Sequence, residues 1–219
     1  VENVTLQNES SIGNLVASGS FGKGGDVVIN ARSLFLSNST VSAIILGEGA
    51  GGNLTVKATD SIQLIGTTAA GRSSGLFAQA NSGSRGDAGD LSIETRMLIV
   101  RDGAQVGSVT FGEGAGGDLT VTATDSVQTI GESADGRLSS GLFSQARSRG
   151  NAGNLSIETG TLIVRNGAEV SSGTFSEGAG GNLTVNAADS IQVIGTTADG
   201  RFPSLLTART RADGNAGDL

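Results

Sequence analysis

The residues of this sequence whose types could support catalysis are carboxylates and arginines, and each of them recurs along the chain. Enzymes that cleave polysaccharides need paired carboxylates at a defined separation, or clustered Asp beside Arg or Lys. Here the charged residues repeat after 64 or 65 positions, in the sets Glu48, Glu113 and Glu177; Asp60, Asp125 and Asp189; Glu94 and Glu158; and Arg72, Arg137 and Arg201. A catalytic site would occur once and would interrupt the repeat. The repetition therefore favours a surface pattern.

The composition supports the same expectation. The chain has no Cys, His or Tyr, so the usual nucleophiles and general bases are largely missing. We expect no enzyme, and no catalytic, cofactor-binding or metal-binding residue. A balance of 14 Lys and Arg against 21 Asp and Glu gives a net charge of −7. This charge is spread along the repeats without a basic stripe, so we expect no nucleic-acid partner. No run of about 18 apolar residues is present that could span a membrane.

Glycine-rich turns punctuate the chain, and they superficially resemble calcium-binding repeats. The phrase Gly-Ala-Gly-Gly-Asn/Asp-Leu-Thr-Val occupies residues 49–56, 114–121 and 178–185, and a shorter relative occupies 87–93 and 151–157. Calcium-binding nonapeptide repeats are far more closely spaced than these turns. The residue after the glycines is Asn at three turns and Asp at two, in the order Asn53, Asp90, Asp118, Asn154 and Asn182. Asn and Asp both form turns, but they are not equivalent calcium ligands, so we expect a turn role.

The phenylalanines are the remaining candidates for a binding surface. Phe77 and Phe143 recur in Gly-Leu-Phe-x-Gln-Ala, with Leu206 as the third member, and this fits an inward-facing ladder. Phe111 and Phe175 lie beside glycine turns, with Leu46 as their earlier counterpart. Either set could instead form a partly exposed stripe, and the sequence leaves this open.

The spacing of the turns defines the elements that carry these residues. Successive turns alternate between short coils of about 28 residues and long coils of about 36, which is the mark of a solenoid. Within each coil, apolar and polar residues alternate over four to six positions, as in β-strands. We predict three short strands per coil, stacked into a parallel β-helix. Equivalent leucines should then lie over one another, in the order Leu54, Leu91, Leu119, Leu155 and Leu183.

The predicted organisation is one all-β segment covering residues 1–219. Residues 1–24 form a degenerate first coil, 25–216 form six full coils, and 217–219 begin another. The chain lacks an initiator Met and ends within a phrase, so we expect a fragment of a longer protein. A β-sandwich is the alternative fold, but it does not explain one fixed interval.

The phrases also resemble a known family. Gly-Gly-Asn-Leu-Thr-Val, Gly-Asn-Leu-Ser-Ile-Glu-Thr and Leu-Ile-Val-Arg-Asn-Gly-Ala-Glu-Val are similar to repeats of filamentous-haemagglutinin-like exoproteins of the cyanobacterial type, over residues 25–219. The resemblance implies a right-handed parallel β-helix, two-partner secretion through an outer-membrane partner, and a place in a secreted or cell-surface filament. It transfers no functional residue, because the family's repeats carry no catalytic motif.

These observations predict a structural stalk or adhesin segment of an exported filament, with a cell-surface or carbohydrate ligand as a further partner. The alternative is a carbohydrate-binding or polysaccharide-cleaving β-helix. Open coil ends could also drive end-to-end association of the chain.

Overall fold

The structure, a computed structural model, describes residues 1–175, 177–211 and 214–219, and the described residues fold into β-strands joined by turns and loops. Seven strands form sheet A: β1 (Asn3–Gln7), β3 (Val27–Ser37), β5 (Leu54–Ile65), β7 (Leu91–Arg101), β9 (Leu119–Ile130), β11 (Leu155–Arg165) and β13 (Leu183–Ile194). Seven shorter strands form sheet B: β2 (Ser11–Val16), β4 (Thr40–Ile45), β6 (Gly75–Ala80), β8 (Gln105–Thr110), β10 (Gly141–Ala146), β12 (Glu169–Thr174) and β14 (Leu205–Thr210).

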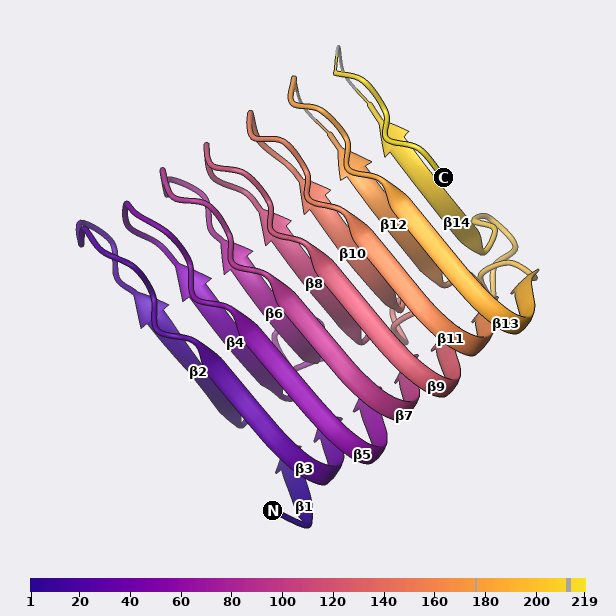
Figure 1. The fold of residues 1–219 in the computed structure, drawn as a ribbon. Coiled ribbons are helices and arrows are strands. Elements are labelled where there is room, and N and C mark those ends of the chain that lie inside the picture. The colour runs from indigo at the N-terminus through magenta and orange to yellow at the C-terminus, as the bar shows by residue number, and fades with distance from the viewer. Residues whose placement is uncertain (176, 212–213) are drawn as a thin grey trace.

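Both sheets are parallel, and their strands follow one another in chain order along a single axis (Figure 1). Each strand of sheet A is followed by a strand of sheet B, and the chain then returns to the neighbouring position in sheet A. Every spatial neighbour within a sheet is therefore one coil away in the sequence. The chain is a parallel β-helix, as its fixed repeat interval predicts. A sandwich of antiparallel layers is excluded.

The leucine ladder of sheet A is confirmed residue by residue. Leu54 pairs with Leu91, and the register continues through Leu119 and Leu155 to Leu183. All five side chains are at most 1% exposed. Burial of one leucine removes enough apolar surface from water to stabilise the fold by about 1.5–3 kcal/mol. The same contribution is added with each coil, so the core is a column along the axis.

Sheet B faces this column with its own ladder. Val41, Leu76, Val106, Leu142 and Val170 are partners in neighbouring strands, and each is fully buried. Because successive residues of a strand point to opposite faces, the residues beside them lie on the outer side of the sheet.

Each coil contains two strands, not the predicted three. The first two predicted pieces form one long strand that bends, as the curved strands of Figure 1 show. In β5 the bend coincides with a register shift between Ala58 and Ser61, where the partner strand has only Arg96 between Thr95 and Met97. Asp60 and Ser61, a polar pair of the kind that often forms a corner between strands, therefore lie at a bulge inside a continuous strand.

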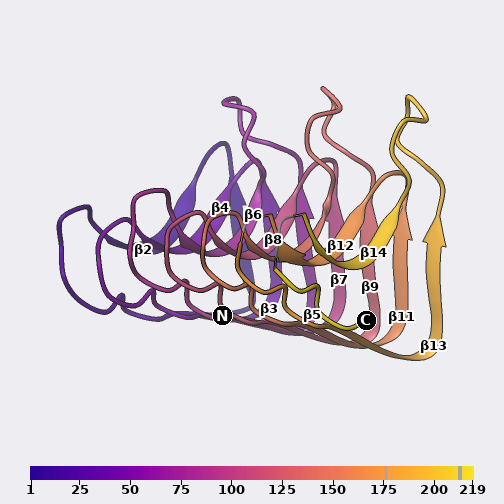
Figure 2. The same ribbon diagram turned by 90° about the horizontal axis from the view of Figure 1, so that it is seen from above.

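Long and short coils differ mainly in the loop between their two strands. In short coils this connection is a tight turn, and Asp102 and Gly103 both take the positive φ angles (59° and 86°) that favour these residue types. In long coils it is a loop at residues 66–74, 131–140 or 195–204, each with an isolated antiparallel bridge. These loops project from every second coil on one side of the molecule (Figure 2).

Candidate functional site

Several of the recurring acids lie on the surface beside cations from neighbouring coils. At the bend of sheet A, the guanidinium of Arg96 donates hydrogen bonds to Asp60 and Asp125, which belong to the coils on either side. Hydrogen bonds from Arg96 lower the pKa of Asp60, and the positive charges of Arg96 and Arg32 lower it further. Asp60 and Asp125 recur two coils apart, and the structure places a cation from the intervening coil between them.

A second column follows the same rule. Arg85, on a long coil, lies 2.7 Å from Glu48 and 3.8 Å from Glu113, which belong to the short coils on either side. Lys57 and Glu94 form a single ion pair of 2.6 Å on neighbouring strands. All of these side chains are exposed, so each pair contributes little to stability on its own. At Glu48, Asp60, Glu94, Glu113 and Asp125, the recurring acids therefore have a partner of opposite charge on a neighbouring coil.

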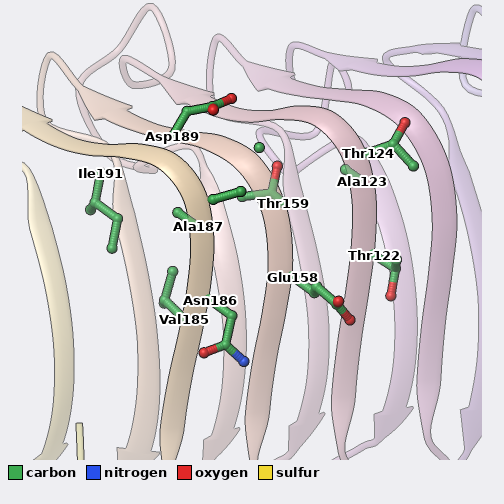
Figure 3. Close-up of a pocket in the computed structure, with 12 residues that line it drawn as sticks. Thr122, Ala123, Thr124, Glu158, Thr159, Val185, Asn186, Ala187, Asp189 and Ile191 are labelled. Carbon is green, nitrogen blue, oxygen red and sulfur yellow. The ribbon is translucent and has the colours of Figure 1, made fainter.

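The bend also has a place where its charge column is interrupted. Gly160 occupies the position on β11 that Arg96 occupies on β7, so Asp125 and Asp189 flank a residue without a side chain. Figure 3 shows the resulting hollow, with Thr124 and Asp189 contributed by strands on either side of β11. Both carboxylates are exposed, and the hollow opens to solvent. The corner therefore differs from the preceding one by the loss of an ion-pair bridge.

The turn residues have the structural role expected of them. The side-chain oxygen of Asn53 accepts a hydrogen bond from the backbone N–H of Asp90 at 3.0 Å. The same bond links Asp90 to Asp118 at 2.9 Å, and continues through Asn154 to Asn182 at 3.1 Å. Asn and Asp serve equally here, because only one acceptor oxygen is needed. Across the described residues, the structure contains no group of three or more acidic side chains placed to hold a metal ion.

The phenylalanines of sheet B lie on its outer side, so of the two arrangements that the sequence left open, the inward ladder is not the one observed. Leu142 is fully buried in the core, and its neighbour Phe143 therefore lies on the opposite face of the strand. Leu206 pairs with Val170 in the row of Leu142, so it is not the third member of the Phe set. The two-residue alternation around Leu142 is the sequence signal that could have shown this.

A groove lies on this outer face, and we call it the sheet B groove. It has a volume of about 670 Å³, and its floor contains Ser42, Phe77, Gln79, Gln105, Phe111 and Arg147. The loop at residues 66–74 forms one wall, and Leu138 from the next projecting loop contributes to the other side. The Gln105 amide donates to the backbone oxygen of Ser139 at 3.0 Å, which fixes this loop to the floor. The volume falls in the range of small-molecule sites.

One end of the groove is marked by a column of alternating aromatic and cationic side chains. Phe111, Arg147, Phe175 and Arg211 directly follow β8, β10, β12 and β14. The Arg147 guanidinium lies 5.7 Å from the centre of the Phe111 ring and 5.0 Å from that of Phe175. Arg209 and Arg211 lie 5.2 and 5.1 Å from the Phe175 ring. These are cation–π distances. Phe111 is exposed, as in the partly exposed stripe that the sequence left open, but the arginines of this column were missed.

The electrostatics of this column are unusual for an acidic protein. Three guanidinium groups surround the Phe175 ring, and Glu169 pairs with Arg209 at 2.7 Å. Desolvation lowers the pKa of Arg147, and the charges of Arg209 and Arg211 add to this, while Glu169 opposes it. An arginine guanidinium is charged at neutral pH in proteins. The column therefore presents concentrated positive charge beside aromatic rings.

The fold defines the protein as a β-solenoid. The sheet B groove and the column of Phe and Arg side chains lie on the outer side of one of its two sheets. Comparisons with protein-family models, with curated proteins and with solved structures gave no match. In the part of the chain that the structure describes, no helix is long and apolar enough to cross a membrane.

Proposed function

We propose that this chain is a structural segment of a secreted or cell-surface filament, where it works as a stalk or adhesin without catalysis. The observation that supports this is the continuous parallel pairing of both sheets, in which equivalent partners, and in sheet A the same bulge, recur from coil to coil. Parallel strands joined in this way resist bending and stretching along the axis, because deformation must break a row of backbone hydrogen bonds. The resemblance to filamentous-haemagglutinin-like repeats supports export through an outer-membrane partner.

A stalk differs from an enzyme in tolerating a change in repeat number. Solenoid stability is close to a sum over repeats and their interfaces. Duplicating residues 90–153, one short and one long coil, should give a folded, longer chain with a higher melting temperature. The expected readouts are an unchanged circular dichroism spectrum per residue and retained display of the parent protein on cells. An unfolded product, or loss of display, would overturn the stalk proposal.

Export is tested separately in cells that produce the parent protein. Deleting the gene for the outer-membrane partner should trap the protein inside the cell envelope, and restoring that gene should return it to the surface. Surface display that continues without the partner would refute two-partner secretion while leaving the stalk role intact.

We propose glycan binding in the sheet B groove as the second candidate function. Aromatic rings such as Phe77 and Phe111 offer flat faces for sugar rings, and Gln79 and Gln105 offer amides for hydroxyl groups. The only described carboxylate lining the groove is Glu9, whose Oε1 accepts the Ala69 N–H at 2.7 Å. Cleavage of a glycan would need a second carboxylate, so the lining favours binding over hydrolysis. Incubation with acidic and neutral polysaccharides should therefore give retention on the polymer without depolymerisation.

A further inference from the structure

We propose that the sheet B groove selects acidic glycans, and that Arg147 binds a carboxylate or sulfate group of the sugar chain. This inference rests on the second candidate function, glycan binding in the groove, and it assigns the ligand's charge and the residue that recognises it. It is independent of the stalk role.

Arg147 is held in a fixed orientation by the residues around it. Its Nε and Nη2 donate to the Oε1 atom of Gln145, at 3.3 and 3.0 Å. Gln145 is 1% exposed, and its own amide nitrogen donates to Ser171 Oγ at 2.7 Å, which fixes the amide with its oxygen toward Arg147. The guanidinium plane is further confined by Phe111 and Phe175. The Nη1 side of the guanidinium is therefore available to a ligand. The guanidinium is already oriented before the ligand binds.

The positive charge of the site favours an anionic ligand. Among the described residues Arg147 forms no ion pair, and the Glu169 carboxylate nearby is already paired with Arg209. Stacking between rings removes part of the water around the guanidinium, so a bound anion interacts with it more strongly than with a fully hydrated side chain. Charge-assisted hydrogen bonds of this kind are about twice as strong as neutral ones.

The shape of the site favours a sugar chain over a peptide. Peptides commonly bind sheets by adding a strand to an edge, but β4, β6 and β8 beneath this groove already pair on both sides. A ligand on the outer face therefore meets only side chains, here Phe77, Gln79 and Gln105 beside Arg147. Arg147 and Arg211 follow strands two coils apart. That is roughly 10 Å at the usual strand spacing, a distance comparable with one disaccharide unit of an extended glycan.

The test measures binding of defined oligosaccharides to the full chain by calorimetry. The probes are an oligogalacturonate, the same oligomer with its carboxylates methyl-esterified, and a heparin oligosaccharide that carries sulfates. We expect the oligogalacturonate to bind at least about tenfold more tightly than its ester, the equivalent of one charge-assisted hydrogen bond. Tighter binding of the heparin probe would identify sulfate as the preferred group, and tighter binding of the oligogalacturonate would identify carboxylate.

The variants locate the effect. Arg147→Gln should abolish the preference for the acidic oligomer, and Arg147→Lys should restore only part of it, because lysine lacks the planar fork. Arg149→Gln removes the same charge two residues away, on an exposed side chain outside the groove, and should change affinity by less than about twofold. Thermal melts of all variants check that the fold is intact.

Three results overturn the inference, and they can be told apart. If the acidic oligomer and its ester bind with equal affinity, and Arg147→Gln leaves both affinities unchanged, the groove binds glycans without discriminating by charge. If no oligosaccharide binds, glycan binding itself fails, together with this inference. Equal losses in Arg147→Gln and Arg149→Gln would show a diffuse charge effect and would also refute the assignment.

Discussion

The side-chain oxygen of Asn154 accepts a hydrogen bond from the backbone N–H of Asn182 at 3.1 Å, one full coil further along the chain. The backbone N–H of Asn154 in turn donates to Asp118 at 2.7 Å. Each turn is therefore attached to the next by a side chain. The glycines beside these residues bring the turns close enough for this contact, so the column of turns forms one continuous hydrogen-bonded edge.

Removing one member of this column should cost a measurable amount of stability. Asn154→Ala deletes the acceptor for the Asn182 N–H, and we expect the free energy of unfolding to fall by about 1 kcal/mol. Asn186→Ala is the control, because this exposed side chain of β13 makes no hydrogen bond to the described residues. Chemical denaturation followed by circular dichroism compares the two. Equal effects would contradict the ladder.

The leucine column predicts a much larger effect. Leu119 is fully buried between Leu91 and Leu155. Leu119→Ala leaves a cavity that its neighbours cannot fill, so the free energy of unfolding should fall by about 2–5 kcal/mol. Thr120→Ala changes the outward neighbour and should stay within about 0.5 kcal/mol. A small effect at Leu119, measured in the same denaturation experiment, would show that the column does not form the core.

The glycine turns should tolerate substitution only where the coils leave room. A Cβ atom on Gly153 would lie 2.2 Å from the backbone oxygen of Gly117, whereas one on Gly25 would meet only the Asn14 side chain at 3.9 Å. Gly153→Ala must therefore separate two coils, and we expect a loss of about 2–3 kcal/mol. Gly25→Ala should be nearly neutral. Similar melting temperatures for the two variants would contradict the close approach of the turns.

The charge column at the bend predicts a pH dependence. Arg96 lowers the pKa of Asp60 below its ordinary value of 3.8, so this carboxylate binds its proton less readily in the folded state than in the unfolded chain. Its contribution to stability is therefore present above the unfolded-state pKa and is lost as the pH falls through the folded-state pKa. Arg96→Gln should raise the pKa of Asp60 toward 3.8, as NMR titration of the carboxyl carbon would measure.

Two comparisons check this prediction. The stability difference between wild type and Arg96→Gln should shrink as the pH falls below about 4, and it should shrink with added salt. Arg165→Gln, an exposed charge change on β11 outside this column, should leave the Asp60 titration unchanged. An unaltered Asp60 pKa in Arg96→Gln would refute the bridge.

The repeat interval made the fold and the register predictable. Equivalent residues of a solenoid must face one another, so the pairing of Leu54 with Leu91 follows from spacing alone. The number of strands per coil was harder to predict. The polar residues Asp60 and Ser61 have the composition of a turn, but the strand continues through them because each coil supports the bend of its neighbour.

The candidate site was only partly visible in the sequence. Strict alternation from the buried Leu142 places Phe143 outward, and this signal was present but was outweighed by the apolar character of Phe. The stacking of Arg147 between Phe111 and Phe175 had no comparable signal. It depends on which residues follow the strands of three successive coils, and the turns of those coils have unequal lengths.

The most direct test of the stacked register uses paired cysteines, which the cysteine-free sequence makes unambiguous. Ser92 and Thr120 are exposed partners on β7 and β9, at a strand spacing of about 4.8 Å that a disulfide can span. Thr124 lies four residues further along β9, about 13 Å away. Under mild oxidation, Ser92→Cys/Thr120→Cys should form an intramolecular disulfide and Ser92→Cys/Thr124→Cys should not. Equal cross-linking of both pairs, or of the second pair alone, would contradict the β-helix register.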